Sequence, residues 1–364
     1  MMIERDKTQR QSNIELLRIM AMLGVIILHY NNPQMGGGIA YARGINKSIL
    51  YGLESLFACS VNLFILISGY FMSKNSKRTI IKPLELILQV ILFKEILFLA
   101  KVLIGREPFS ILKIMNNLIP TNWFVMLYVT LYLISPAINV VIEKATEKDV
   151  LRKFVVIFFM LFSIYPTGVD LLQEILGRDI VGISSVGMYG SQWGYSIVNF
   201  SLMYFLGACL KRVNVNKLKN MRYLLRIFIL TGSLMIWAYL NDLTGYGTER
   251  TAWEYCNPLV ILLAVEIFML FKQTNLGTVN YINGLAKGSF TVFLLHNSLL
   301  PFIKIERLVT LNFLLMLVLV FLSAGAIYVV CWGVYKIYEF VSRPIYNWLI
   351  RRIPLLTQNI YEGL

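Results

Sequence analysis

The chain has 364 residues, of which 57% are hydrophobic and only 15% charged, and its mean hydropathy is +0.65. A soluble globular protein is nearer half apolar and a quarter charged, so this composition excludes an ordinary soluble domain. The net charge of +14 would suit nucleic acid, but the basic residues gather in alternate loops between apolar runs, which argues against a nucleic-acid partner and indicates a membrane protein.

Apolar runs long enough to cross a membrane recur along the whole sequence. The loop set formed by the N-terminus, 73–82, 143–153, 211–226, 272–287 and the C-terminus holds most of the Lys and Arg residues. The positive-inside rule then places both termini in the cytoplasm, and the basic excess also attracts anionic lipid headgroups. The predicted fold class is therefore all-α, a polytopic membrane helical bundle of about ten transmembrane helices, near residues 14–30, 49–72, 83–104, 120–142, 154–168, 194–210, 223–241, 256–271, 286–303 and 313–340.

We expect one transmembrane domain over 1–364, with a short cytoplasmic lead at 1–12 and a cytoplasmic tail at 345–364. The first apolar run lacks a small-residue cleavage pattern and is expected to stay as a membrane helix. In the fifth run, Pro166 and Gly168 are expected to cut the helix short. The cysteines are scattered without metal-ligand spacing, so we expect no metal site and no disulfide at Cys59, Cys209, Cys256 or Cys331.

Only two histidines occur, and each lies inside an apolar run, His29 in 14–30 and His296 in 286–303. Arg18 precedes His29 by eleven residues, which places both on nearly the same helix face, roughly 16 Å apart along the axis. An ionisable residue inside the membrane is a functional candidate by default, and imidazole titrates near neutral pH. Simpler interpretations remain open: a solvated interfacial His29, an Arg18 paired with Glu15, and a His296 that makes a helix-packing hydrogen bond.

Five landmarks, in order along the chain, resemble those of the acyltransferase-3 family of integral membrane acyltransferases. In helix order they are Arg18 with His29 after ten intervening residues, the run Phe64-Ile-Leu-Ile-Ser68-Gly69-Tyr70-Phe71, the run Asn122-Trp123-Phe124, the run Ser289-Phe-Thr-Val-Phe293-Leu-Leu-His296, and Glu339 with Arg343-Pro344. Phe293 stands where the family usually has tyrosine, and Ile81 stands where it often has the second arginine of an Arg-x-x-Arg pair.

The resemblance implies transfer of an acyl group, usually acetyl, from cytoplasmic acyl-CoA to a hydroxyl of a cell-surface or exported polysaccharide, or of a lipid-linked sugar. Acyl-CoA would be a co-substrate, and no bound cofactor is expected. The implied location is the plasma membrane, as a multi-pass protein of a bacterial inner membrane, with the oligomeric state and any partner protein left open. The alternative is an exporter of glycan or lipid-linked sugar without acyl-transfer chemistry.

The resemblance also assigns roles to residues. His29 is expected to act as general base or, as an alternative, as a transient acyl carrier. Arg18 is expected to bind the phosphates or pantetheine of acyl-CoA, or else to order the helix interior. Ser68 and Tyr70 would line the thioester passage at the Gly69 turn, and basic residues of the next loop would meet the donor, unless they are ordinary positive-inside charge: Lys77, Arg78 and Lys82. Asn122, Trp123 and His296 are assigned either to the acceptor side or to supporting positions behind the catalytic residues.

Overall fold

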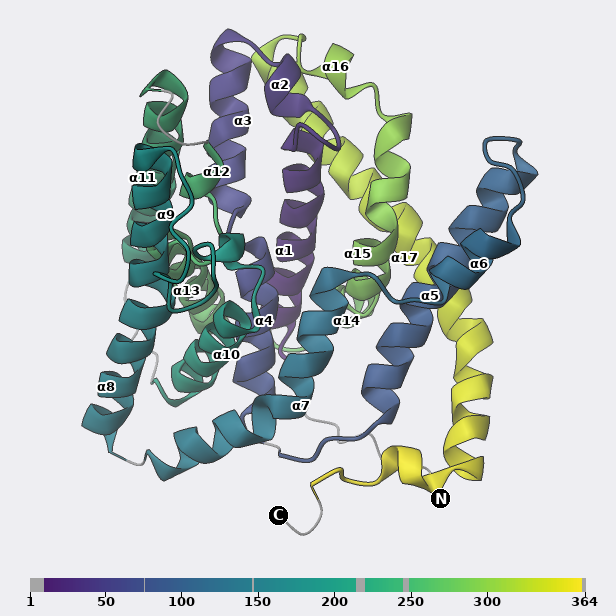
Figure 1. The fold of residues 1–364 in the computed structure, drawn as a ribbon. Helices are drawn as coiled ribbons and strands as arrows, with labels where there is room; N and C mark the ends of the chain where they lie inside the picture. The colour runs from purple at the N-terminus through teal and green to yellow at the C-terminus, as the bar shows by residue number, and fades with distance from the viewer. Residues whose placement is uncertain (1–9, 75, 146, 214–219, 245–248, 362–364) are drawn as a thin grey trace.

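The computed structural model describes residues 10–74, 76–145, 147–213, 220–244 and 249–361, and in these every regular element is a helix (Figure 1). The α-helices are α1 Ser12–Asn31, α2 Gly38–Tyr41, α3 Gly44–Phe57, α4 Ser60–Met72, α5 Ile81–Leu103, α6 Ile111–Asn117, α7 Trp123–Lys144, α8 Lys148–Phe159, α9 Tyr165–Leu176, α10 Ile197–Arg212, α11 Asn220–Thr244, α12 Glu249–Ala252, α13 Pro258–Gln273, α14 Asn280–Ala286, α15 Ser289–Leu299, α16 Ile305–Leu308 and α17 Phe313–Arg352. The all-helical class is confirmed.

Six segments of the described chain are long and apolar enough to cross a membrane. They are Ser12–Asn31, Gly44–Met72, Trp123–Lys144, Lys148–Leu176, Asn220–Thr244 and Phe313–Arg352. The other four predicted ranges also form helices. Of these, α10 and α13 have 16 residues each, α15 has 11, and the 23-residue α5 carries charges along its length, at Lys82, Glu85, Lys94, Glu95 and Lys101.

The prediction that Pro166 and Gly168 end the fifth helix is wrong. The helical path continues from Lys148 to Leu176 through a π-helical segment, Met160–Ile164, that joins α8 to α9. Proline removes a backbone donor and would normally break or kink a helix. A wider turn placed just before Pro166 accommodates the missing donor, as π-bulges do, and α9 then ends at Gly177, which adopts the left-handed conformation.

Helix α1 forms the centre of the bundle, and 15 of its 20 residues are buried. It contacts α3, α4, α13, α14, α15 and α17, which surround it in Figure 1. Gly24 permits the close approach of α4, because a methyl group at this position would lie 2.3 Å from Ser60 Oγ. The central position of α1 explains why its polar residues Arg18 and His29 face other helices rather than lipid.

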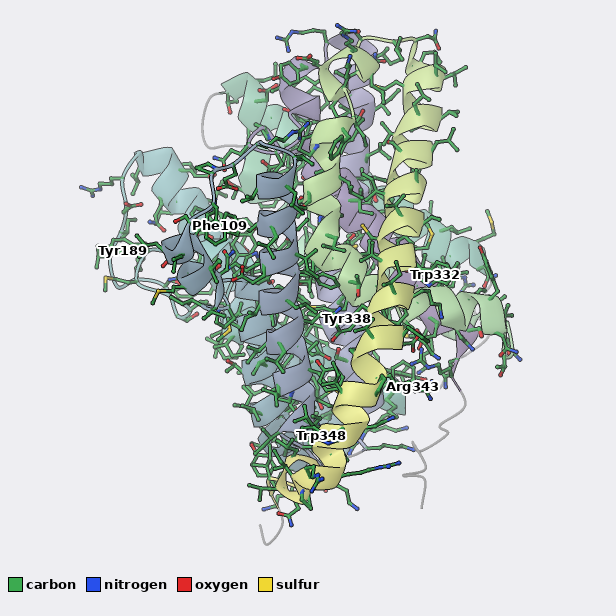
Figure 2. The ribbon with its side chains drawn as sticks, turned by 90° about the vertical axis from the view of Figure 1, so that its right-hand side faces the viewer. Phe109, Tyr189, Trp332, Tyr338, Arg343 and Trp348 are labelled. Atoms are coloured by element: carbon green, nitrogen blue, oxygen red, sulfur yellow. The ribbon has the colours of Figure 1, made fainter. Side chains whose placement is uncertain are left out.

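Helices α4 and α10 pack against each other through a pair of glycines. A methyl group at Gly69 would lie 2.1 Å from the Tyr204 carbonyl oxygen, and one at Gly207 would lie 2.1 Å from the Leu66 carbonyl oxygen. Small residues let membrane helices approach at backbone distance, as this pair does. Helix α17 runs along the outside of the bundle and carries Trp332, Tyr338, Arg343 and Trp348 along its length (Figure 2).

The bundle has two distinct ends. Helix α1 begins at one of them, and α4, α7, α10 and α17 end there (Figure 1). Basic residues close several of these helices, so we call this the basic end: Lys144, Lys211, Arg212, Arg351 and Arg352. His29 lies in the last turn of α1, toward the opposite end.

Candidate active site

The two histidines are in direct contact. His296 Nε2 lies 2.6 Å from His29 Nδ1, and the rings stack with centroids 4.7 Å apart and an interplanar angle of 19°. Asn297 Oδ1 lies 2.8 Å from the same His29 Nδ1. Helix α15 thus supplies two neighbouring side chains to one nitrogen at the end of α1. The sequence predicts neither this contact nor the part played by Asn297, whose only signal is its place next to His296.

The acceptors around the pair determine the positions of the protons. His296 Nδ1 lies 3.0 Å from the Val292 carbonyl oxygen, which can only accept, so Nδ1 carries the proton and Nε2 of a neutral ring is an acceptor. His29 Nδ1 faces that acceptor and the Asn297 carbonyl oxygen, so it must be the donor. The lone pair of neutral His29 is therefore on Nε2, which has no hydrogen-bond partner in the described part of the chain. This nitrogen can accept a proton from a substrate.

A cavity of about 370 Å³ lies between the basic end and the histidine pair, and its lining stops one helical turn short of both histidines. Val25, four residues before His29 on nearly the same face of α1, lines it, and so does Phe293, whose ring centroid lies 6.1 Å from that of His296. The wall near the histidines is apolar, and the opposite part is polar and charged. The charged lining residues are Arg10, Arg18, Lys287 and Glu339.

Arg18 lines this cavity and is also paired with Glu15. Its Nη1 donates to Glu15 Oε2, and Arg10 Nη1 lies 3.5 Å from the other oxygen of the same carboxylate. Glu15 is buried, whereas the Arg18 side chain keeps 26% of its surface exposed. The pairing predicted as an alternative is thus present, and the guanidinium still offers donors to the cavity, because a single N–H of its five is used by Glu15.

Ser68 and Tyr128 form a polar patch in the cavity wall. Both residues line the cavity, their hydroxyl oxygens lie 3.2 Å apart, and Ser68 Oγ donates to the Phe64 carbonyl oxygen at 2.9 Å. The placement of Ser68 is consistent with its predicted role. Gly69 and Tyr70 do not line the cavity: Gly69 faces the Tyr204 carbonyl, and the Tyr70 ring packs against Phe268 at 5.2 Å.

The basic loop after α4 lies outside this cavity. Arg78 is 2% exposed, and its guanidinium donates to the Tyr132 carbonyl oxygen, Ser135 Oγ and the Lys77 carbonyl oxygen. Lys77 and Lys82 are exposed, and Lys82 Nζ lies 6.0 Å from the centre of the Tyr132 ring. Their predicted role toward acyl-CoA stays a prediction, and none of these side chains lines the route to His29.

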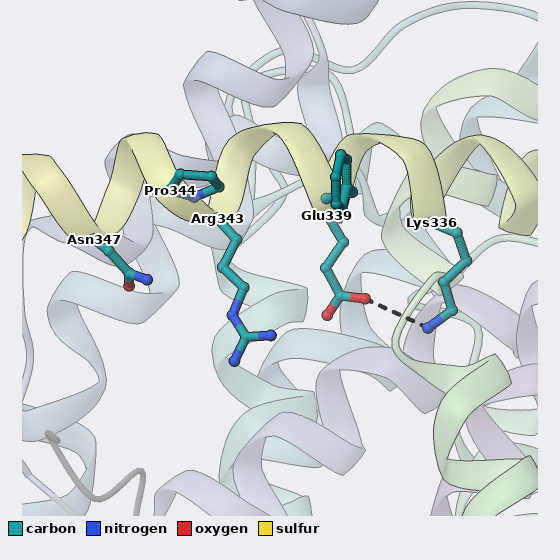
Figure 3. A pocket seen from close by; sticks show the side chains of 6 residues that line it. Lys336, Glu339, Arg343, Pro344 and Asn347 are labelled. Atoms are coloured by element: carbon teal, nitrogen blue, oxygen red, sulfur yellow. Dashed lines mark hydrogen bonds and ion pairs between the residues drawn. The ribbon is translucent and has the colours of Figure 1, made fainter.

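A second cavity, of about 500 Å³, adjoins the first along α17, and Glu339 lines both. Figure 3 shows Lys336, Glu339, Arg343 and Asn347 projecting from the same side of this helix, with Lys336 Nζ 3.4 Å from Glu339 Oε2. Lys336 and Arg343, together with Arg10 and Lys287, supply basic groups along the two cavities. Sequence reasoning marked Glu339 and Arg343 as landmarks and missed Arg10, Lys287 and Lys336.

Trp123 and Asn122 begin α7. Asn122 caps this helix, because its side-chain oxygen accepts from the Val125 backbone N–H at 3.1 Å. Trp123 is 39% exposed and belongs to an aromatic cluster in which its ring centroid lies 4.5 Å from that of Tyr195 and 6.3 Å from that of Tyr255. An exposed indole beside other rings is the kind of surface on which a sugar ring can stack, which leaves the predicted acceptor role of Trp123 as a prediction.

The fold and the site define a class: a polytopic helical membrane protein with a hydrogen-bonded histidine pair near a partly charged internal cavity. A family model described as an acyltransferase domain matches residues 11–336. The chain belongs to the acyltransferase-3 family and is a membrane acyltransferase. No curated protein and no solved structure gives a significant match.

Proposed function

We propose that the protein transfers an acyl group, acetyl in the first instance, from acyl-CoA to a hydroxyl of a surface or exported glycan, with His29 as general base. The observation that carries the proposal is the hydrogen-bonded trio His29–His296–Asn297. It lies one helical turn beyond Val25 and Phe293, which line the apolar part of a cavity whose other lining residues include Arg10, Arg18 and Lys287. A base with a fixed tautomer and a route for an anionic donor are the two parts that such a transfer needs.

The donor is proposed to enter from the basic end, which would face the cytoplasm. Acyl-CoA carries several phosphates, and these would lie among Arg10, Lys287, Lys336 and Arg343, with Arg18 deeper in the cavity. The pantetheine arm is long, thin and largely uncharged, so it suits the apolar part of the cavity beyond Arg18. The cavity volume of about 370 Å³ falls in the range of sites that hold small molecules.

The proposed chemistry uses one proton and one bond exchange. His29 Nε2 accepts the proton of the acceptor hydroxyl as that oxygen attacks the thioester carbonyl. The carbon–sulfur bond then breaks and the acyl group stays on the acceptor oxygen. The CoA sulfur leaves and takes from His29 the proton that came from the acceptor hydroxyl. His296 Nε2 and Asn297 Oδ1 both accept from His29 Nδ1–H, so they stabilise the imidazolium that forms between these steps.

The acceptor is proposed to approach from the opposite end, where α1 ends. His29 is partly exposed, unlike His296, which is 1% exposed. The exposed rings of Trp123 and Tyr195 offer a stacking surface for a sugar, and hydroxyl groups are the nucleophiles that a histidine base activates.

The test uses the full chain in nanodiscs with [¹⁴C]acetyl-CoA and, in parallel, with a panel of oligosaccharides. Wild type is expected to release CoA and to label an oligosaccharide, and Arg18→Gln is expected to need more acetyl-CoA for the same rate. Lys153→Ala, which removes an exposed cation of α8 outside both cavities, is the matched control and should behave as wild type. Folded wild type that neither binds nor turns over acetyl-CoA, acyl-CoA of longer chain or any acceptor would contradict the proposal and favour an exporter.

A further inference from the structure

A second buried polar cluster lies away from the histidine cavity, where α9 meets the segment that precedes α13. Asp170, Glu254 and Cys256 each offer a ligand atom there, and these atoms lie within 4.8 Å of one another. Glu254 and Cys256 are 4% and 1% exposed. None of the three lines either cavity described above, so the proposed acyl transfer does not account for them.

The cluster holds the loop between α9 and α10 in place. Ser191 N–H donates to Asp170 Oδ1 at 2.9 Å, and Ser191 Oγ donates to Glu254 Oε2 at 3.3 Å while it accepts from Trp193 N–H at 3.0 Å. Trp193 has a φ of +57°, which is strained for a residue with a side chain, and its carbonyl oxygen accepts from Tyr255 N–H at 3.1 Å. The two carboxylates therefore fix the strained turn that precedes Tyr195.

Glu254 is buried and Asp170 half-buried, and the two carboxylates present like charges to each other. Within the described residues no Lys or Arg forms an ion pair with Asp170 or Glu254. Two carboxylates so placed require either a shared proton or a cation between them.

Unsatisfied oxygens distinguish these two possibilities. Gln173, one helical turn after Asp170 on α9, is 9% exposed, and its Oε1 is buried without a hydrogen-bond donor, as is Asp170 Oδ2. Both side chains point toward the backbone of Gly190, where an added methyl group would lie 1.9 Å from Asp170 Oδ1 and 2.7 Å from Gln173 Oε1. A proton shared by the carboxylates would leave the Gln173 oxygen unsatisfied. A cation could instead be coordinated by side-chain oxygens of Asp170, Gln173 and Glu254 together.

We propose that Asp170, Gln173 and Glu254 bind a divalent cation of the calcium type, which ties α9 to the 190–194 turn and to the start of α13. Two carboxylates and an amide oxygen are hard ligands, which calcium prefers, and it binds such oxygens at about 2.3–2.6 Å. Opposed ligands at that range are separated by close to 5 Å, which agrees with the 4.8 Å within which ligand atoms of Asp170 and Glu254 lie. The Gln173 oxygen is placed beside Asp170 by their shared approach to Gly190. The site would stabilise the loop that carries Trp193 and Tyr195.

The test measures cation binding and thermal stability, without acyl-CoA. Full-length protein in nanodiscs is treated with EDTA, dialysed, and titrated with Ca²⁺, Mn²⁺ or Zn²⁺. The proposal predicts about one equivalent of Ca²⁺ or Mn²⁺ and a Tm that rises on Ca²⁺ addition and falls in EDTA. Asp170→Asn should weaken binding at least tenfold, and Asp242→Asn, which removes a carboxylate paired with Lys47, should not change it.

Glu254→Gln separates the cation from the shared proton, because glutamine mimics the protonated acid. If a cation is bound, this variant loses the Ca²⁺-dependent rise in Tm; if a proton is shared, it is as stable as wild type and Ca²⁺ affects neither protein. Binding of none of the three ions by wild type would overturn the proposal. Binding of Zn²⁺ alone, lost in Cys256→Ser, would overturn the assignment of oxygen ligands. The cation titration of the wild-type protein tests the proposal even if a variant fails to fold.

Discussion

The histidine pair and the surroundings of Arg78 are two polar centres buried in the same bundle, and they are built differently. Arg78 is held by the protein itself: its guanidinium donates to Tyr132, Ser135 and Lys77, and its backbone bonds Asn359 and Ile360 of the C-terminal segment. His29 uses one ring nitrogen in the same way and leaves the other available. A buried polar residue is therefore a candidate for chemistry when one of its polar atoms, such as His29 Nε2, has no hydrogen-bond partner in the described part of the protein.

The largest effect is expected at His29. Replacement by alanine removes the general base, which typically contributes about 10²–10⁴-fold to the rate. We expect kcat per folded molecule to fall by that factor, and Tm to fall modestly, because the buried His296 Nε2 loses its donor. Steady-state kinetics and a thermal scan on the same nanodisc sample check both parts, and an unfolded variant would be recognised in the scan.

A smaller loss of rate is expected at His296, which acts through His29. Phenylalanine keeps a ring at this position and removes the nitrogen that accepts from His29. A hydrogen bond to a charged group contributes about 1.5–3 kcal/mol, so kcat should fall roughly 10–100-fold. The KM for acetyl-CoA should not move. Glutamine, whose amide oxygen can accept, should recover part of the rate. Equal loss in both variants, or a change confined to stability, would assign His296 to packing alone.

Arg78 should respond in the opposite manner. Arg78→Lys leaves buried acceptors at Tyr132 and Ser135 without their donor, at a cost of about 1–3 kcal/mol of stability. The expected result is a lower Tm with kcat per folded molecule close to wild type. A selective rise in KM for acetyl-CoA with unchanged Tm would instead make Arg78 part of the donor site, as its place in the sequence suggests.

Arg18 is expected to affect donor binding. Arg18→Gln removes a cation that lines the cavity, so KM for acetyl-CoA should rise about tenfold, near 1.4 kcal/mol, while kcat changes less. The effect should weaken for short thioesters that lack the phosphates. A KM that is equally affected for a phosphate-free thioester would assign Arg18 to the helix interior through Glu15.

The smallest effect is expected at Lys82, an exposed cation outside the cavity. Alanine at this position should change stability by less than about 0.5 kcal/mol and the rate by less than about twofold. Kinetics at two salt concentrations measure this. A large rise in KM at low salt would show that the exposed loop steers the donor, and would weaken the contrast between this loop and the cavity.

Hydropathy predicted much of the fold, because apolar runs of membrane length identify helices directly, and α1 and α7 begin and end within three residues of their predicted ranges. Hydropathy reasoning was wrong at Pro166, where a π-helical segment lets the helix continue past the proline. Family landmarks and helical spacing found His29, Arg18 and Ser68. They could not find the His29–His296 bond, which depends on the packing of α1 against α15, or the Asp170–Glu254 cluster, whose members are far apart in sequence.

The central claim is that Nε2 of His29 takes the acceptor proton, and chemical rescue tests it most directly. His29→Ala in nanodiscs would be assayed for acetyl transfer over a range of added imidazole concentrations, with His296→Phe as a matched variant that keeps the base. The account predicts that His29→Ala is nearly inactive and recovers activity in proportion to imidazole, while His296→Phe does not respond. Wild-type turnover by His29→Ala without imidazole would contradict the account.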